Sequence, residues 1–214
     1  MPDDHTPHDD TPPPSAPPFA VLYADPPWHP KGGVRLPYPT MSTPAICALP
    51  MSLLCAEDCC LFLWATHGRL PDALRVLAAW GFTYKTVAFT WVKANRTRPG
   101  FFAGQGGWTR ANPEVCLLGT RGRPKRASAA VANLVVSPRR EHSRKPEEVR
   151  ERIVSLCGDV ARAELFAREK VDGWAAWGDE VECDFALPGA SAPRTVGSDC
   201  RFGPARRTRA GEAT

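Results

Sequence analysis

Residues 19–28 read Phe19-Ala20-Val21-Leu22-Tyr23-Ala24-Asp25-Pro26-Pro27-Trp28. The apolar run 19–24 predicts a buried strand, and the two prolines predict a sharp turn at its end. Asp25 offers a hydrogen-bond acceptor, and Pro26 offers a carbonyl that Pro27 should hold outward, because a proline ring fixes φ. Trp28 offers a ring that can stack on a nucleic acid base.

This stretch suits the methylation of an amino group on a base. Such an amine is a poor nucleophile because its lone pair is delocalised into the ring, so an enzyme must accept both amino hydrogens. Asp25 and the Pro26 carbonyl would be the two acceptors, and Trp28 would stack on the extruded base. The alternative interpretation is a strand followed by an ordinary Pro-Pro turn with a half-buried tryptophan.

Composition indicates one soluble domain. The chain has 214 residues and is 43% apolar, which is enough for one substantial core. No apolar run is long enough to span a membrane, and the acidic, proline-rich N-terminus does not resemble a signal peptide, so we expect a cytoplasmic protein. The eight cysteines include no Cys-x-x-Cys pair and the histidines are scattered, so we expect no metal site.

The positive charge is clustered. The net charge is only +4, but the first 18 residues carry acidic groups and no lysine or arginine. Lysine and arginine gather in three segments, 93–98, 121–126 and 139–145. Clusters of this kind are a footprint for a phosphate backbone, although each also fits a solvated loop.

Strand-like and helical patterns alternate along the chain. We expect strands over 19–24, 59–66, 82–93, 115–119 and 161–167, a further segment over 133–137, and a glycine-rich loop over 99–108. Helices are expected over 45–54, from Pro71 to Gly81, and from Pro146 to Gly158. This order predicts an α/β domain of three layers with a mainly parallel sheet over residues 19–187. The proline-rich segments 1–18 and 188–214 are expected to be disordered.

The order of the motifs is informative. No Gly-x-Gly-x-x-Gly follows the first strand, so a nucleotide-like cofactor must bind at a later strand. The catalytic loop therefore precedes the cofactor-binding strand.

Several separate blocks now resemble the MT-A70 family, S-adenosylmethionine-dependent methyltransferases that act on the exocyclic amine of adenine. The blocks are Ala24–Trp28, Leu36–Ser42, Leu61–Trp64, Trp91–Lys93, Trp108–Leu118, Ser143–Glu148, Glu164–Arg168 and Trp174–Glu180. They cover essentially all of the expected domain. The resemblance implies a permuted Rossmann-like class I methyltransferase fold.

The resemblance also implies roles for individual residues. The catalytic residues would be Asp25, Pro26, Pro27 and Trp28. The cofactor S-adenosyl-L-methionine would contact Asp25, Lys145, Glu164, Leu165, Phe166, Arg168, Asp179 and Glu180, with Lys145 on its carboxylate. The substrate side would include Trp28, Tyr38, Lys93, Trp108 and Glu114. Asp179 departs from the asparagine often found in the family, which keeps an acceptor but loses a donor.

We therefore expect an enzyme that methylates the 6-amino group of adenine in DNA. DNA is favoured over RNA because the chain is short. RNA methylation is the first alternative, and a catalytically inactive nucleic-acid-binding partner subunit is the second. The intact Asp25 argues against the inactive subunit. Homodimer formation is left open.

Overall fold

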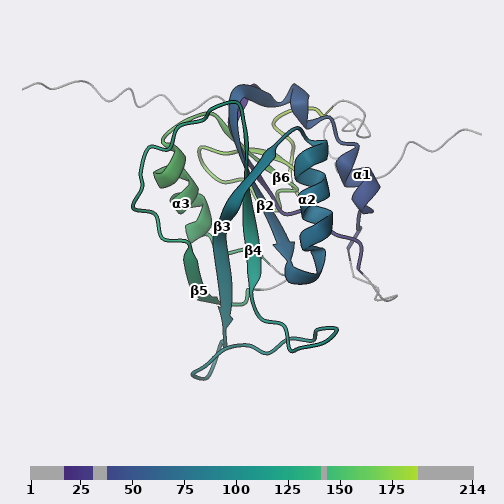
Figure 1. Cartoon of the computed structure of the whole chain (residues 1–214), viewed down its shortest axis with the longest axis vertical. Helices are drawn as coiled ribbons and strands as arrows, with labels where there is room; N and C mark the ends of the chain where they lie inside the picture. Colours follow the sequence, from purple (N-terminus) through teal and green to yellow (C-terminus); the bar gives the residue numbers. More distant parts are fainter. Residues whose placement is uncertain (1–16, 31–37, 141–143, 188–214) are drawn as a thin grey trace, which may run out of the picture.

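One seven-stranded sheet forms the centre of the molecule (Figure 1). The computed structural model describes residues 17–30, 38–140 and 144–187. The strands are β1 (Phe19–Ala24), β2 (Cys55–Thr66), β3 (Thr83–Ala94), β4 (Glu114–Arg121), β5 (Leu134–Pro138), β6 (Arg162–Leu165) and β7 (Ala175–Trp177), in the order β5-β3-β4-β2-β1-β6-β7. Apart from Pro17 and Pro18, the two tails expected to be disordered lie outside the described residues.

The sheet is mainly parallel, as predicted. β1 pairs in parallel with β2 and β6, β6 pairs in parallel with β7, and β3 pairs in parallel with β5. Only β4 is antiparallel to its neighbours β2 and β3 among the described strands.

Helices cover both faces of the sheet, which confirms the three-layer architecture. α1 (Thr43–Cys47) and α2 (Leu70–Ala79) lie over one face, and α3 (Glu148–Cys157) lies over the other (Figure 1). Alternate residues of the central strands supply two separate cores, since side chains of a strand point to opposite faces. Leu22, Leu61 and Leu63 pack with α1 and α2, whereas Tyr23, Phe62, Trp64, Val149 and Ile153 pack on the side of α3.

The helix expected over 45–54 is wrong in its extent. α1 spans only Thr43–Cys47, and a separate 3-10 turn, Met51–Leu53, follows it. Pro50 has no N–H to donate and its ring clashes with the preceding turn, so a continuous helix cannot pass through it. The start was predicted correctly, with Ser42 as the N-cap accepting from the Ala45 amide at 3.3 Å.

The strand registers bring distant segments to one edge of the sheet. Ala24 at the end of β1 pairs with Leu165 at the end of β6, which in turn pairs with Trp177 at the end of β7. The segments that follow these strands therefore begin side by side. β4 runs in the opposite direction, so its first residue, Glu114, lies opposite Thr66 at the same edge. We call this edge the carboxyl edge.

Among the described residues, no helix has the length and apolar character needed to cross a membrane.

Candidate active site

The Asp-Pro-Pro-Trp loop leaves the carboxyl edge directly after β1. Its backbone is fixed on both sides, because the Trp28 amide donates to the Pro26 carbonyl at 2.8 Å and the Met41 amide donates to the Pro27 carbonyl at 2.8 Å. The Pro26 carbonyl, expected to be held outward as an acceptor, thus already accepts one hydrogen bond. One of its lone pairs is used within the loop, and its second lone pair is what can accept another hydrogen bond.

Trp28 is anchored rather than free to swing. Its ring packs against the core, and its Nε1 donates to the Trp64 carbonyl at 3.1 Å. The Trp64 ring is held in turn, since its Nε1 donates to the Tyr23 hydroxyl at 2.7 Å. The backbone of β2 therefore holds the Trp28 ring through one hydrogen bond, and Tyr23 of β1 holds the neighbouring Trp64 ring.

Four charged side chains alternate in sign at the carboxyl edge. Lys145 Nζ lies 2.6 Å from Asp25 Oδ2 and 3.2 Å from Glu114 Oε2, and Lys93 Nζ lies 2.5 Å from Glu114 Oε1. We call Asp25, Lys145, Glu114 and Lys93 the charged chain. It joins β1, the loop before α3, and the adjacent ends of β3 and β4, which are remote in sequence.

Burial differs along the charged chain. The Lys145, Glu114 and Lys93 side chains are 11%, 10% and 14% exposed, whereas the Asp25 side chain is 34% exposed. Asp25 is therefore the member most open to an incoming molecule. The Lys145 ammonium also lies 5.6 Å from the centre of the Trp64 ring, which gives it a cation–π contact.

The site shifts the pKa values of its acids in opposite directions. Burial raises the pKa of Asp25, and Lys145 only partly opposes it. Burial also acts to raise the pKa of Glu114, but the ammonium groups of Lys145 and Lys93 outweigh it and the pKa lies below its ordinary value. Burial would lower the pKa of Lys145, yet Asp25 and Glu114 together raise it. Lys145 is thus a permanent cation at the centre of the charged chain.

Tyr38 lies close enough to the charged chain to feel its field. Burial raises the pKa of its hydroxyl, and the Asp25 carboxylate raises it further. The residue is nevertheless 38% exposed. The predicted substrate role of Tyr38 stays a prediction, supported by an exposed side chain within the electrostatic influence of Asp25.

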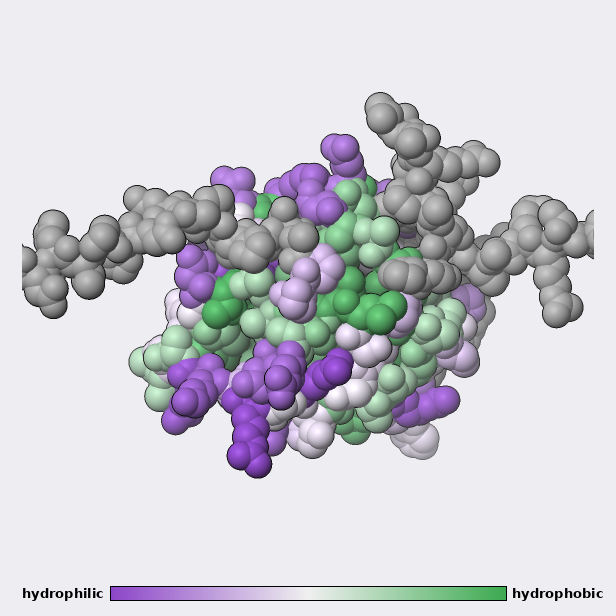
Figure 2. Space-filling model, turned by 90° about the horizontal axis from the view of Figure 1, so that it is seen from above, coloured by the Kyte–Doolittle hydropathy of each residue, from purple (hydrophilic) through white to green (hydrophobic). Residues whose placement is uncertain are grey.

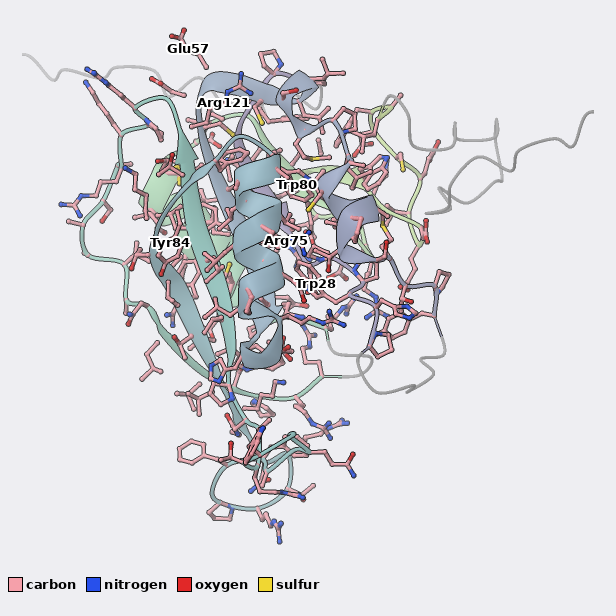
Figure 3. The ribbon with its side chains drawn as sticks, turned by 45° about the vertical axis from the view of Figure 1, so that its right-hand side comes forward. Trp28, Glu57, Arg75, Trp80, Tyr84 and Arg121 are labelled. Carbon is pink, nitrogen blue, oxygen red and sulfur yellow. The ribbon has the colours of Figure 1, made fainter. Side chains whose placement is uncertain are left out.

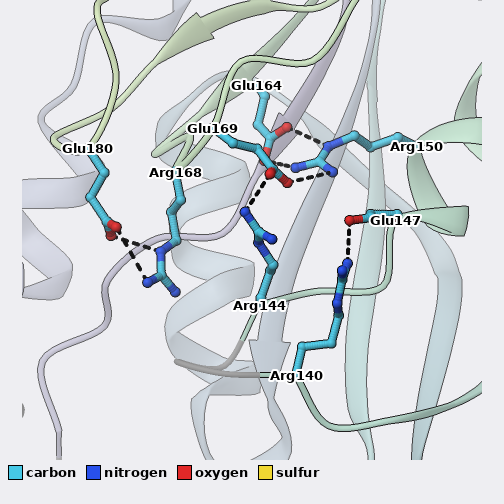
Figure 4. A network of polar contacts seen from close by, with 8 residues as sticks. All are labelled: Arg140, Arg144, Glu147, Arg150, Glu164, Arg168, Glu169 and Glu180. Atoms are coloured by element: carbon cyan, nitrogen blue, oxygen red, sulfur yellow. Dashed lines mark hydrogen bonds and ion pairs between the residues drawn. The ribbon is translucent and has the colours of Figure 1, made fainter.

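Glu164 has a different environment from the one expected for a cofactor contact. Its carboxylate receives both Nε and Nη2 of Arg150 at 2.7 and 3.0 Å, and Arg150 also lies 3.5 Å from Glu169 (Figure 4). Glu169 is paired with Arg144 as well. The Glu164 and Arg150 side chains are each 12% exposed. The bidentate pair ties β6 to α3, which is a structural role beside any contact to a cofactor.

The segment after β6 has an unusual backbone. Phe166 has a φ of 61°, which a residue with a side chain seldom adopts. Its ring packs edge-on against Trp177 with centroids 5.5 Å apart, and the Ala167 amide donates to the Trp177 carbonyl at 2.9 Å. A side chain at Gly178 would lie 2.1 Å from the Ala167 carbonyl oxygen. The predicted cofactor segments 164–168 and 178–180 are therefore in direct contact, and strained backbone of this kind is typical of binding sites.

Arg168 and Glu180 extend from this region. Arg168 Nε donates to Glu180 Oε1 at 2.8 Å (Figure 4), and the two side chains are 33% and 54% exposed. Asp179 lies between Gly178 and Glu180 in sequence. The structure thus groups Phe166, Arg168 and Glu180 in one region, and their contact with a cofactor stays a prediction.

Trp108 is not part of the charged chain. It lies in the loop 95–113, which projects from the ends of β3 and β4 at the bottom of Figure 1, and it is fully exposed. Asn112 closes the base of this loop. Its Oδ1 accepts from the Lys93 amide at 2.9 Å, and its Nδ2 donates to the Lys93 carbonyl at 2.8 Å and to the Phe102 carbonyl. Lys93, also predicted on the substrate side, points its ammonium at Glu114.

The sequence reasoning missed several residues that support the site. Arg150, Asn112 and Trp64 hold the predicted site residues Glu164, Lys93 and Trp28 in place, and Tyr23 holds Trp64. Tyr23 and Trp64 carried a signal, since each places a polar ring atom in an otherwise apolar strand and such an atom needs a partner when buried. Arg150 and Asn112 carried none, because their partners are distant in the chain.

Within the residues that the structure describes, no three histidine, cysteine, aspartate or glutamate side chains are grouped to hold a metal ion.

Comparison with known proteins identifies the family of this chain. The MT-A70 family model matches residues 19–180. A type II methyltransferase, M.MunI, from Mycoplasma sp is 29% identical over 76% of this chain and 78% of its own length. A putative N(6)-adenosine-methyltransferase MT-A70-like protein from Medicago truncatula is 33% identical, and the human N(6)-adenosine-methyltransferase catalytic subunit METTL3 is 30% identical.

The extent of the match differs between these relatives. The chain spans most of the Mycoplasma protein but only 26% and 28% of the Medicago and human proteins, although each match covers about three quarters of this chain. The residues that the family model matches include the Asp25 loop, the charged chain and the segments around β6 and β7. This chain belongs to the MT-A70 family.

Proposed function

We propose that this protein transfers the methyl group of S-adenosyl-L-methionine to the exocyclic 6-amino group of adenine in DNA. The observation that carries the proposal is the position of Asp25. Its carboxylate lies at the end of β1, 2.6 Å from a buried lysine, beside the ends of β6 and β7. Cofactors of α/β proteins bind at this edge of a parallel sheet.

The loop after β1 supplies the acceptors that the amine requires. Asp25 and the second lone pair of the Pro26 carbonyl would each accept one amino hydrogen, which turns the nitrogen lone pair toward the methyl group. Both acceptors are held before substrate arrives, Asp25 by Lys145 and Pro26 by the Trp28 amide. Acceptors that need no reorganisation are an effective source of rate enhancement.

The residues at the carboxyl edge fit the cofactor. Its amino-acid end needs a cation for the carboxylate and an acceptor for the ammonium, and Lys145 and Asp25 provide both within one ion pair. Phe166, Leu165, Arg168, Asp179 and Glu180 would hold the nucleoside end. When bound, the cofactor supplies an electrophilic methyl group.

The substrate side is proposed to begin at Trp28 and Tyr38. The anchored Trp28 ring would stack on the extruded adenine, and Tyr38 would line the opening above Asp25. Glu114 would act through Lys145 by holding its ammonium on Asp25, and Lys93 would hold Glu114 in the same way.

DNA is favoured over RNA because the match to the Mycoplasma type II methyltransferase covers most of both chains. RNA remains the first alternative, since the N(6)-adenosine-methyltransferases are of similar identity. An inactive partner subunit is disfavoured by the complete set of Asp25, Lys145 and Glu114 in contact.

The test uses labelled S-adenosyl-L-methionine with DNA and RNA oligonucleotides of matched sequence, followed by identification of the modified base. We expect label in N6-methyladenine from DNA. Label in RNA alone would replace the substrate assignment, and no label in either, from a protein that binds the cofactor, would favour the inactive subunit.

A further inference from the structure

A cavity of about 800 Å³ lies at the carboxyl edge. It is lined by residues from the end of β5, from the segment before α3, and from the segments that follow β6 and β7. Arg144 and Pro146 of its wall flank Lys145 in sequence. The cavity therefore adjoins the proposed active site at the carboxyl edge.

The wall of the cavity is rich in arginine. Five arginines and three glutamates line it, and the arginines are Arg96, Arg139, Arg140, Arg144 and Arg168. Two of the pairs in Figure 4, Arg140–Glu147 and Arg168–Glu180, have side chains that are 33–57% exposed. Exposed ion pairs of this kind contribute little to stability, so their guanidinium groups can leave the glutamate and bind a phosphate instead. Arginine binds phosphate through two parallel hydrogen bonds.

This charge does not suit the cofactor. S-adenosyl-L-methionine carries a sulfonium and an ammonium against one carboxylate, so its net charge is positive. Arg168 and Glu180 border the proposed cofactor region, whereas Arg96 comes from loop 95–113 and Arg139 and Arg140 come from the segment that follows β5. The excess of guanidinium groups fits a polyanion.

Aromatic rings continue the same surface. The Arg139 guanidinium lies 3.8 Å from the centre of the Phe102 ring. Phe101 is 64% exposed and Trp108 is fully exposed on the same loop, 95–113. Surfaces that bind single-stranded nucleic acids typically combine positive side chains along the phosphate backbone with exposed aromatic rings on which bases stack.

A second basic segment lies at the opposite end of the sheet. Residues 121–126 follow β4, whose seven steps from Glu114 to Arg121 span about 24 Å at 3.4 Å per residue. Figure 3 shows Arg121 and Glu57 at the end opposite to the projecting loop. Figure 2 views that end, and hydrophilic residues lie at several places around a more apolar centre. The Arg123 amide there donates to Asp58 at 2.7 Å.

We propose that the arginine-lined cavity and the rings of loop 95–113 bind the phosphates and neighbouring bases of a single-stranded DNA segment that flanks the target adenine. The segment 121–126 takes no part in this binding. The proposal rests on the proposed function for the identity of the nucleic acid, but it concerns binding and not methyl transfer.

The test compares two triple variants of the full chain that each remove three positive charges. The first is Arg96→Gln, Arg139→Gln and Arg140→Gln. The matched control is Arg123→Gln, Lys125→Gln and Arg126→Gln. Binding of a fluorescent single-stranded DNA 20-mer is measured without cofactor at several salt concentrations, after equal melting temperatures have shown that both variants are folded.

We expect the cavity triple to lose affinity at least about tenfold. Its slope of log affinity against log salt should fall by roughly 0.7 for each phosphate that the variant no longer neutralises. The control triple should retain the parent slope. Equal losses of affinity in the two triples, or no loss in the cavity triple, would overturn the proposal.

Two further measurements separate the neighbouring explanations. Calorimetric titration with S-adenosyl-L-methionine should give the parent dissociation constant for the cavity triple and a weaker one for Lys145→Ala. If the cavity triple binds the cofactor more weakly but binds DNA normally, the cavity belongs to the cofactor and the proposal is refuted. The proposal is also refuted if the cavity triple loses affinity for a single-stranded RNA 20-mer but not for the DNA 20-mer. A loss of DNA binding in a protein that never transfers a methyl group would support this surface while rejecting the proposed function.

Discussion

At the scale of single residues, the chemistry of this protein centres on one shared cation. Lys145 lies between Asp25 and Glu114, so it stabilises two carboxylates at once. Asp25 is the more exposed of the two and has the raised pKa, while Glu114 is buried and has the lowered pKa. One acid is therefore available to meet a substrate, and the other holds the lysine in place.

Replacing Asp25 with alanine should abolish most methyl transfer and leave the fold intact. The residue lies in a loop outside the core, and it is one of two oriented acceptors for the amine. By analogy with loss of an oxyanion-hole donor, we expect turnover to fall by about 10²–10³. Turnover is measured with labelled cofactor and the melting temperature by calorimetry. A folded variant with activity within a few-fold of the parent would remove Asp25 from the catalytic assignment.

The fall in activity at low pH should follow the protonation of Asp25. Asp25 accepts best when ionised, and its pKa is raised, so activity should fall with decreasing pH above the ordinary aspartate value of about 3.9. Lys145→Gln removes the charge that lowers this pKa, so the acid limb should move to higher pH. Glu114→Gln removes a charge that raises it, so the limb should move to lower pH.

These profiles are compared after each variant is normalised to its own plateau. Opposite displacements in the two variants are the expected result. Displacement in the same direction, or none, would show that another group controls the limb.

At the scale of elements, the site depends on which way each strand runs. The antiparallel β4 begins where its neighbours end, and this places Glu114 at the carboxyl edge, where it meets Lys145. The sequence predicted β4 from its apolar run but contained no signal for its direction. The strand pattern likewise predicted β1, β2 and β6, because buried apolar runs depend only on local composition.

Other features could not be predicted locally. β7 has only three residues, too few for a period to be recognised. The Arg150–Glu164 pair and the Asn112 hydrogen bonds depend on residues that meet only in the folded chain. The error in α1 was avoidable, since Pro50 was visible in the sequence.

The contact between the ends of β6 and β7 predicts a sharp response to one methyl group. In Gly178→Ala, the new carbon would lie 2.1 Å from the Ala167 carbonyl oxygen and 2.6 Å from its nitrogen. Backbone must move, so we expect a loss of about 1–3 kcal/mol of stability together with weaker cofactor binding. Gly68→Ala is the control, because its added carbon meets nothing within 4 Å. Equal free energies of unfolding for the two variants in denaturant would contradict this account.

At the scale of the whole molecule, the two ends of the sheet carry different groups of residues. The carboxyl edge bears the charged chain, the cavity and loop 95–113, and the opposite end bears the basic segment 121–126. The basic segments 93–98, 121–126 and 139–145 are alike in composition, but they lie at different positions relative to Asp25 in the fold. Only the fold could make this distinction.

The position of loop 95–113 at the carboxyl edge leads to a prediction about single-stranded and duplex DNA. An adenine amine cannot be reached within a duplex stack, and extrusion costs least in single strands. We expect the target adenine to be methylated at least as fast in single-stranded as in duplex DNA. Initial rates on one oligonucleotide, alone and annealed, decide this. A strong duplex preference would mean that loop 95–113 actively opens the helix.

The hydrogen bonds of Asn112 have one more consequence. They close loop 95–113 at its base, so we expect Lys93 and Glu114 to keep their places when residues 95–111 are exchanged and Asn112 is retained. The loop can in this sense be exchanged without moving the residues at its base. We expect that loops taken from other members of the family will change which nucleic acid sequence is methylated but will leave the rate of methyl transfer unchanged.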